Sequence, residues 1–459
     1  MTIPDTYWLL FIFAIAPFRS NCAVVGLMTN TEAGVFRVTD LGAVADGATD
    51  CTTSFQNAIH EAAKQGGIVL VSPGRYLFRG HLVIESGVHL VGLNSSPQSW
   101  EPQKGSILLP TEGRDHEDEH AFLEMRSSTS VEGLTIYYPD QKTDDVRPYP
   151  WTIQIRGNPA DAKAVSFDST VENVTLINSY NGIRTGPTEN GRHRLVNIHG
   201  CALRRGVLID WTGDIGRIQN VHFHSHFWAN EAYDGNWERV FKYMQQNLEA
   251  FVFGRTDWEY VNDTFVFPAK VGYRFIETTN GACNGQFSGI GADASATCVL
   301  VEALQPQGIA VVNGEFNSHL VGAATQVIVE RSCRSNIRFL NCGFWGPVEC
   351  NARLLGPSFL SFQNCYFSND AATTNYSILA QNGKLQVEGC TFDARSKFRR
   401  PGNAWREADV RDQPGSVHLQ RGVEHAIVTG NNGYYGVSIR NDIGRKAIIK
   451  NNEPFATRN

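Results

Sequence analysis

The sequence predicts a parallel β-helix, an all-β solenoid whose coils stack along one axis. Three observations favour this fold: a short segment recurs, phenylalanine recurs within it, and a second β-branched segment follows most copies. The recurring segments begin at Asn220, Asn262, Asn284, Asn313, Asn341, Asn364 and Gly389, at intervals of 42, 22, 29, 28, 23 and 25 residues. Periods of about 20 to 50 residues indicate a repeat architecture, and most of these intervals fit one coil.

Phenylalanine occupies the fourth position of every copy, and the column consists of Phe223, Phe265, Phe287, Phe316, Phe344, Phe367 and Phe392. Because coils of parallel strands stack about 4.8 Å apart, we expect these rings to stack in the core. Side chains alternate along a strand, so the second position also faces inward, and Cys342, Cys365 and Cys390 are expected to be small buried residues. The third position then faces outward, at Thr175, His199, His222, Thr264, Gln286, Glu315, Gly343 and Tyr366.

The second strand of each coil ends in an acidic residue, at Asp210, Glu277, Glu302 and Glu330. Stacked carboxylates of this kind could bind a cation, line a trimer interface, or face water between cations such as Arg217 and Arg331. The sequence leaves these three interpretations open.

The N-terminal part of the coil region predicts a capping helix. Asp50 to Thr53 supplies helix-start chemistry before an apolar-periodic segment from Phe55 to Ala63, and Gly66 and Gly67 end that helix before a strand from Ile68 to Val71. A helix there would cover the open strand edges of the first coil. We therefore expect one β-helix domain over residues 35–455, with a cap over 35–94.

This cap, with "LGAVADGATDCTTSFQNAI", "GGIVLVSPGRY" and "GVHLVGL", resembles the opening of the pectate-lyase-like right-handed β-helix superfamily. The resemblance implies a right-handed coil. Members of the superfamily include polysaccharide lyases, polygalacturonase-like hydrolases, epimerases and phage tailspikes, so the fold alone does not fix the reaction. The NTD, DD, GHG and RIK signatures of polygalacturonases are missing, and the Asp144-Asp145 pair lies in a loop rather than before a coil strand.

Composition and termini narrow the functional classes. A formal net charge of -6 over 459 residues argues against general nucleic-acid binding, and no window after the N-terminus has about 20 uninterrupted apolar residues that could span a membrane. The apolar run from Trp8 to Phe18 predicts a signal peptide over residues 1–24, although Asp5 and the lack of a preceding Lys or Arg depart from that pattern. We expect a secreted or periplasmic protein with a polysaccharide as partner. Three copies of the chain could also associate as a homotrimer.

A long insertion from Phe227 to Tyr260 interrupts the repeat and is rich in aromatic residues, including Trp228 and Trp258. Within it, "NWERVFKYMQQN" has helical spacing, with Trp237, Val240, Phe241 and Met244 on one side. Packing of this helix against the coil is the simpler interpretation. Long excursions from a regular scaffold are also where binding sites are built, and aromatic faces suit sugar rings.

The alternating histidines of "NVHFHSHFW" favour a strand rather than a metal centre. His222 and His224 share one strand face, where they are either solvent-exposed or hydrogen-bond a substrate. No carboxylate or cysteine completes a ligand set nearby, so we expect no metal.

Candidate catalytic residues follow the phenylalanine strands, where the resembling hydrolases hold their carboxylates. That place offers Arg204, Arg205, Lys270, Asp293, His319, Glu349 and Asp370. Asp293 is the first choice because Gly289 and Gly291 before it permit close approach, with Glu315 and Asp257 as partner carboxylates. The predicted substrate-binding residues are Arg205, His222, His224, Trp228, Trp258, Lys270 and Arg274.

Glycoside hydrolysis by a carboxyl pair is the first functional hypothesis, because stacked coils offer the carboxyl spacings that this reaction needs. The alternatives are a lyase that cleaves uronate glycans by β-elimination, and a non-catalytic carbohydrate-binding or adhesin-like β-helix. No cofactor is expected, except Ca²⁺ if the protein is a lyase.

Overall fold

A computed structural model describes residues 34–97, 104–161, 163–321, 324–369, 375–393 and 415–455. The predicted signal peptide and Asp370 lie outside the described residues.

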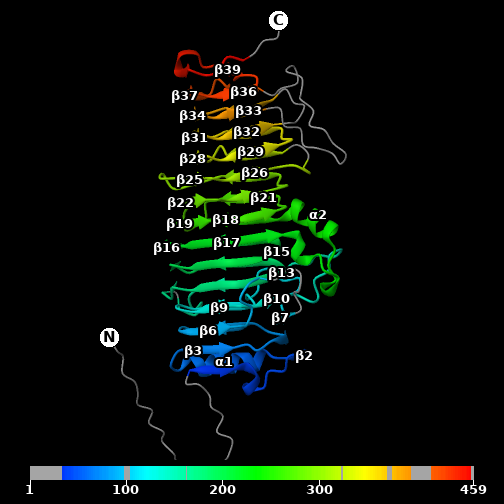
Figure 1. Cartoon of the computed structure of the whole chain (residues 1–459). Helices are drawn as coiled ribbons and strands as arrows, with labels where there is room; N and C mark the ends of the chain where they lie inside the picture. Colours follow the sequence, from blue (N-terminus) through cyan, green and yellow to red (C-terminus); the bar gives the residue numbers. More distant parts are fainter. Residues whose placement is uncertain are drawn as a thin grey trace, which may run out of the picture. The chain divides into compact units, whose positions relative to one another are not determined.

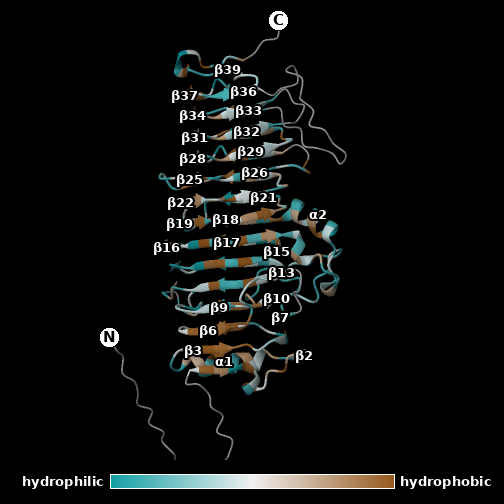
Figure 2. Ribbon diagram, in the orientation of Figure 1, coloured by the Kyte–Doolittle hydropathy of each residue, from teal (hydrophilic) through white to brown (hydrophobic). Residues whose placement is uncertain are grey.

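The chain winds through three parallel sheets in turn, and every coil adds one strand to each sheet (Figure 1). This arrangement confirms the predicted parallel β-helix. Hydrophobic residues lie mainly along the strands (Figure 2), where their side chains fill the space enclosed by the three sheets. The sequence pattern predicted two strands per coil. It missed the strand that each coil contributes to the first sheet.

The strands and their bounds follow the coil order. The first sheet contains β1 (Val35–Arg37), β3 (Gly67–Leu70), β6 (Val88–Val91), β9 (Ser130–Glu132), β13 (Thr170–Thr185), β15 (Arg194–Ile209), β17 (Arg217–His224), β19 (Thr256–Asn262), β22 (Cys283–Ser288), β25 (Ile309–Val312), β28 (Asn336–Leu340), β31 (Phe359–Gln363), β34 (Gly383–Glu388), β37 (Val423–Thr429) and β40 (Ala447–Lys450). The second sheet contains β2 (Asp46–Asp50), β4 (Gly74–Phe78), β7 (Ser106–Pro110), β10 (Thr135–Ile136), later parts of β13, β15 and β17, then β20 (Phe265–Phe267), β23 (Gly291–Ala292), β26 (Glu315–Asn317), β29 (Gly343–Gly346), β32 (Tyr366–Asn369), β35 (Thr391–Phe392) and β38 (Asn432–Gly433). The third sheet contains β5 (Leu82–Ile84), β8 (Leu123–Met125), β11 (Trp151–Ile155), the ends of β13 and β15, then β18 (Glu249–Phe253), β21 (Val271–Phe275), β24 (Thr297–Val301), β27 (Thr325–Val329), β30 (Cys350–Leu354), β33 (Tyr376–Ala380), β36 (Gly415–Leu419) and β39 (Ile439–Asn441).

Three corners join the sheets, and each has its own chemistry. We call the turn from the first to the second sheet corner A, the turn from the second to the third sheet corner B, and the turn from the third back to the first sheet corner C. A short ladder of β12 (Ser166–Phe167), β14 (Asn190–Gly191) and β16 (Thr212–Asp214) runs along corner C and joins β19.

Corner A is built on asparagines in the left-handed conformation, which explains why this residue begins most repeats. Asn197 donates to Asn173 over 2.6 Å, Asn220 donates to Asn197 over 2.9 Å, and Asn341 donates to Asn313 over 2.8 Å. Asparagine tolerates a positive φ, and its amide both donates and accepts, so identical residues stack from coil to coil.

Two of the seven predicted repeat starts were wrong. The register is set by the residue with left-handed backbone at corner A, and this residue is not always asparagine. Asp263 and Gly289 occupy the left-handed corner in place of Asn262 and Asn284. The one-residue slip turns Phe265 outward beside His222 and puts Val266 against Phe223 instead. The second slip leaves Phe287 buried in the first sheet, between Val261 and Val311.

The outward column changes with the same register. Phe265 and Gly291 take the places predicted for Thr264 and Gln286, because Thr264 is buried and Gln286 lies in the first sheet.

The later half of the predicted core column is confirmed. The rings of Phe316, Phe344, Phe367 and Phe392 stack in register with centroids 5.1 Å apart. Cys342, Cys365 and Cys390 are free thiols and almost fully buried, as predicted for small core residues.

Two α-helices accompany the coils. Helix α1 (Thr52–Ala63) lies at the N-terminal end of the coils (Figure 1) and buries Phe55, Ala58, Ile59 and Ala62, so the predicted cap is confirmed. The Asp50 carboxylate accepts the Thr52 N–H over 3.0 Å at its start. Helix α2 (Trp237–Asn247) lies in the insertion, beside the middle coils. In the part of the chain that the structure describes, no helix is long and apolar enough to cross a membrane.

Candidate functional site

A strip of rings runs along the outer face of the second sheet near corner B. His224 stacks on Phe267 with centroids 4.8 Å apart, and Phe267 lies 6.4 Å from the ring of His319. The ring of His319 is nearly parallel to that of Trp345, at 7° and 6.5 Å. His224 and Phe267 come from consecutive coils, Phe267 and His319 are two coils apart with the coil of Asp293 between them, and Trp345 comes from the coil after His319. The strip therefore follows the coil axis. We call His224, Phe267, His319 and Trp345 the ring strip.

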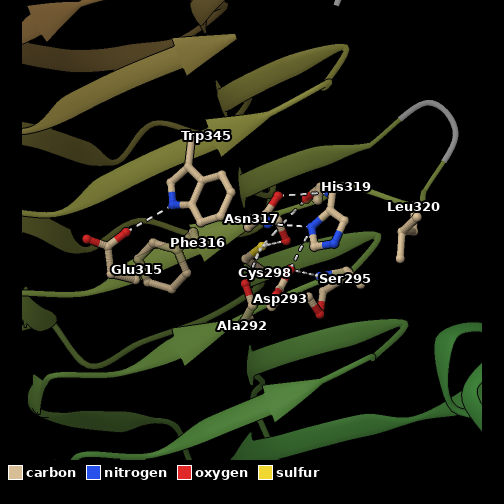
Figure 3. Close-up of polar contacts among 12 residues, drawn as sticks. Ala292, Asp293, Ser295, Cys298, Glu315, Phe316, Asn317, His319, Leu320 and Trp345 are labelled. Atoms are coloured by element: carbon tan, nitrogen blue, oxygen red, sulfur yellow. Dashed lines mark hydrogen bonds and ion pairs between the residues drawn. The ribbon is translucent and has the colours of Figure 1, made fainter. Parts of the chain in front are cut away.

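Asp293 contacts the ring strip through His319. The Nδ1 atom of His319 lies 3.0 Å from Oδ1 of Asp293, and both side chains point toward one another from adjacent turns of corner B (Figure 3). The side chain of Asp293 is 26% exposed and that of His319 is 21% exposed, so a ligand can reach both. The Asp293 carboxylate also accepts the N–H of Ala294 over 2.6 Å, which holds its side chain in place.

Asn317 fixes the position of His319. Its side-chain oxygen accepts the backbone N–H of His319 over 2.8 Å, and its amide nitrogen lies against Nδ1 of the same ring. The thiol of Cys298 lies beneath this group, and burial raises its pKa to about 12, so it stays protonated at neutral pH.

Glu315 lies on the other side of the ring strip, where its carboxylate accepts the indole N–H of Trp345 over 3.0 Å (Figure 3). Gly291 pairs with Glu315 and Ala292 with Phe316, so Asp293 lies one coil before Glu315 and two residues further along. From the strand rise and spacing, their Cα atoms are about 8 Å apart on one face. The structure therefore brings two of the three predicted catalytic carboxylates to one surface.

The insertion forms one rim of this surface. Gln245 of α2 donates to the carbonyl oxygens of Ala294 and Leu320, over 3.2 and 3.1 Å, and so ties the helix to the turns that bear Asp293 and His319. Phe241 of the same helix packs on Phe267 with centroids 5.3 Å apart. The helical stripe predicted from the sequence thus packs against the coil, and it also borders the ring strip.

The predicted histidines His222 and His224 lie on this face but are partly covered by the insertion. Burial lowers the pKa of His222 to about 4, with further contributions from His199 and His226. Burial, followed by the charges of His226 and His222, lowers the pKa of His224 to about 3. Both imidazoles are therefore neutral at neutral pH, which suits hydrogen bonds with hydroxyl groups.

The predicted basic residues gather at a different place, on the third sheet just past α2. Glu249 is almost buried, and Arg274 binds it over 2.8 Å, with Arg205 at 3.8 Å and Arg204 at 3.6 Å. Lys270 precedes the next strand and donates its N–H to the carbonyl of Leu248. The sequence predicted the cations but not Glu249, although an acid just after the helical part of the insertion, between arginine-bearing coils, was a usable signal.

Three further predicted residues lie away from the ring strip. Asp257 and Trp258 are on β19 at corner C, where Asp257 pairs with Arg255 over 2.6 Å. Trp228 is fully buried within the insertion and donates its indole N–H to the carbonyl of Tyr233, so it has no free face for a sugar.

The sequence analysis offered His319 as a candidate but did not select it, and it did not propose Trp345 as a site residue. Their roles depend on which residues of successive coils lie side by side, and the predicted alignment was wrong at Asp263 and Gly289. Among the described residues, no group of three or more His, Cys, Asp or Glu side chains is arranged to hold a metal ion.

Comparisons with known proteins agree with this architecture. A family model described as rhamnogalacturonase A/epimerase, pectate lyase-like, matches residues 35–106, which include the cap. The fold is a parallel β-helix. No curated protein matches the chain.

Several solved structures are similar to the chain at low sequence identity. The DFA-IIIase of Arthrobacter chlorophenolicus A6 gives a TM-score of 0.52 at 10% identity, over 91% of this chain and 99% of that chain. The A-module of the Azotobacter vinelandii mannuronan C-5 epimerase AlgE4 gives a TM-score of 0.43 at 14% identity, over 92% of this chain and 99% of that chain. The Dettilon tailspike protein gives 0.44 at 12% identity, over 89% and 68%. At such identities the likeness concerns the fold alone.

Proposed function

We propose that the chain is a polysaccharide-active enzyme, a glycoside hydrolase whose site is the ring strip with Asp293 and Glu315. The contact between Asp293 and His319, 3.0 Å long and open to solvent, carries this proposal. A carboxylate oriented by an imidazole beside stacked rings provides both a proton-transfer group and a surface for sugar rings.

The two carboxyl groups take different roles. Asp293 accepts a backbone N–H and faces His319, so it is the base that activates water. Glu315 is exposed and interacts with the indole of Trp345, and it is the acid that protonates the leaving oxygen. Retention requires carboxyl groups about 5 to 5.5 Å apart and inversion about 6.5 to 9.5 Å, so the anomeric form of the released sugar distinguishes the two outcomes.

A polysaccharide fits this surface better than a small ligand does. The ring strip extends over several coils, from His224 to Trp345, and a chain of sugars can contact successive rings along it. The name of the family model that matches the cap, which includes rhamnogalacturonase A, also favours a carbohydrate substrate, and an acidic one.

Product analysis with an Asp293→Asn variant tests the proposal. With polygalacturonate, alginate, inulin and dextran as probes, the unaltered protein should release reducing ends from at least one. The variant should lose about 10²- to 10⁴-fold in turnover with an unchanged melting temperature. Glu424→Gln is the matched control, because that exposed carboxylate lies on β37, several coils beyond Trp345, and its turnover should stay near that of the unaltered protein.

The other outcomes separate the alternatives. Unsaturated uronate products, detected by their ultraviolet absorbance, would show β-elimination and replace the hydrolase by a lyase. Binding without either product would favour the non-catalytic module. Normal turnover in Asp293→Asn would remove this carboxyl from the reaction.

We also propose that the protein acts outside the cytoplasm, on the strength of the apolar run from Trp8 to Phe18. Mass spectrometry of the exported protein should find an N-terminus near residue 25. Retention of residues 1–24 would contradict this assignment.

A further inference from the structure

Two tryptophans at corner C are exposed in a conformation that bulky residues avoid. Trp211 is 39% exposed with φ 52°, and Trp258 is 60% exposed with φ 54°. Most non-glycine residues with a positive φ in this chain are asparagine or aspartate, and within the described ranges these two are the aromatic ones. A strained backbone under an exposed large side chain suggests that the outward position of the ring has a use.

A β-bulge turns Trp258 outward. The pairing of β19 with β22 shifts register between Thr256 and Glu259, and Trp258 lies within that shift. Bulges of this kind change the direction of a side chain without breaking the sheet.

The backbone under Trp258 is held by a chain of hydrogen bonds. Its N–H donates to Asn284 over 3.0 Å, Asn284 donates to Gln305 over 2.6 Å, and Gln305 donates to Asp257 over 2.7 Å. Arg255 completes the chain by donating to Asp257 over 2.6 Å. The ring of Trp258 therefore projects from a fixed support.

A cavity opens on the same corner, toward the N-terminal end. It has a volume of about 370 Å³, with Val83 and Val165 among its apolar lining and Glu85, Arg126 and Asn158 among its polar lining. A cavity of this size is at the lower end of the range for small-molecule sites. Most of its lining residues are polar, which suits the hydroxyl groups of a sugar ring.

The short strand ladder connects the cavity to the tryptophans. Val165 directly precedes β12, and β12, β14, β16 and β19 pair in succession. At about 4.8 Å per step, β16 beside Trp211 is about 10 Å from β12, and β19 with Trp258 is about 14 Å away.

We propose that corner C binds a glycan chain at a second site, separate from the ring strip and without catalysis. The chain lies along β12, β14, β16 and β19, with sugar faces on Trp211 and Trp258 and one end in the cavity. This inference rests on the proposed function for the class of ligand, and it adds a second place where the polysaccharide is held.

The charges of this corner favour a hydroxyl-rich ligand over an ionic one. Arg192 binds Asp168 over 2.7 Å and Asp214 over 2.9 Å, between the cavity and the tryptophans. Arg255 is matched by Asp257. Because these cations already have carboxylate partners, they offer little net charge to a nucleic acid or an acidic protein.

The test uses Trp211→Ala with Trp258→Ala in the Asp293→Asn background, so that binding is measured without turnover. Affinity electrophoresis in gels containing polygalacturonate, alginate, inulin or dextran gives the dissociation constant. The double tryptophan change should weaken binding at least about tenfold, as expected when two exposed anchor rings are removed. Tyr434→Ala is the matched control, because Tyr434 is 45% exposed on a late coil, and it should leave binding unchanged.

A second measurement separates this site from the reaction. With Asp293 restored, the double tryptophan variant should cleave a short oligosaccharide within about twofold of the unaltered rate but cleave the long polysaccharide more slowly. Unchanged polysaccharide binding overturns the second site, and so does an altered oligomeric state in size-exclusion chromatography, which would mark a protein interface.

The outcomes for the two proposals are distinguishable. If Asp293→Asn keeps full turnover while the tryptophan variants lose binding, the catalytic assignment fails and the second site stands. If the unaltered protein binds none of the polysaccharides, both fail.

Discussion

The molecule contains two contacts between a carboxylate and a histidine with the same length and opposite surroundings. Inside the coil, Nε2 of His193 lies 3.0 Å from Oε1 of Glu259, and the two side chains are 1% and 0% exposed. On the outer face, His319 and Asp293 are also 3.0 Å apart but are 21% and 26% exposed.

The difference shows that solvent access and freedom to move distinguish a candidate site, whereas contact distance does not. The Thr256 hydroxyl donates to Glu259 over 2.7 Å, and a Cβ at Gly216 would lie 2.3 Å from the His193 ring, so the inner pair has no space for a substrate. The inner pair joins two coils across the coil that bears Gly216, which lies between them. The outer pair faces the ring strip, where a sugar can approach.

The largest effect is expected at the inner pair. Glu259→Ala should lower the free energy of unfolding by about 3 to 5 kcal/mol, because it leaves His193 buried without its carboxylate. Denaturant unfolding measures the change. Asp257→Ala, two residues earlier and partly exposed, is the control and should cost far less. Equal losses in both variants would contradict the structural role of the inner pair.

Phenylalanines inside and outside the coil allow a second comparison of stability. Phe316→Ala should lower the free energy of unfolding by about 3 to 5 kcal/mol, because it removes a fully buried ring from the stack. Phe265→Ala should cost clearly less, since Phe265 is only partly buried, against His222. A melting temperature that does not change in Phe316→Ala would count against the stack, and equal losses would count against the corrected register.

The outer pair should respond in turnover and not in stability. His319→Gln should reduce kcat about 10²-fold with little change in KM, because the imidazole orients the Asp293 carboxylate and can accept the proton that Asp293 takes from water. The pH profile of kcat should change as well, which a merely structural role would not produce. A loss confined to KM would instead make His319 a substrate-binding residue.

The smallest effect concerns pH and the partly covered histidines of the ring face. The pKa values of His222 and His224 are lowered from 6.5 to about 4 and about 3 in the folded chain. Below pH 6.5, these two histidines therefore bind protons in the unfolded chain but remain neutral in the folded chain. Their contribution to stability is complete above pH 6.5 and falls as the pH drops toward 4. Melting temperatures across this window should decline less steeply in His224→Gln than in the unaltered protein. Parallel curves would contradict the burial of His224.

The sequence was sufficient for the features that depend on local pattern. Helix α1, helix α2 and the stacked phenylalanines after Phe316 follow from periodicity and turn chemistry, and each was found where expected. The buried cysteines follow from the same alternation. Asp293 and Glu315 were selected because they follow or face outward from predicted strands, and they do share one surface.

The features that were missed depend on contacts between coils. A repeat can be recognised while its register is one residue wrong, and the wrong register at Asp263 turned Phe265 inward in the prediction and outward in the structure. His319 and Glu249 acquire their partners only when neighbouring coils are aligned, since those partners are one coil or more away in the sequence.

The asparagines of corner A have a mechanical consequence. Amides bond Asn220 to the coil before it and Asn341 to Asn313, but Asp263 and Gly289 stand between Asn220 and Asn313. Since a carboxylate does not donate and glycine has no side chain, amide stacking is interrupted there. These are the coils that bear Phe267 and Asp293. Under a pulling force applied at both ends, we expect the stack to part more readily where amide stacking is interrupted, and these interruptions include the coils of the candidate active site.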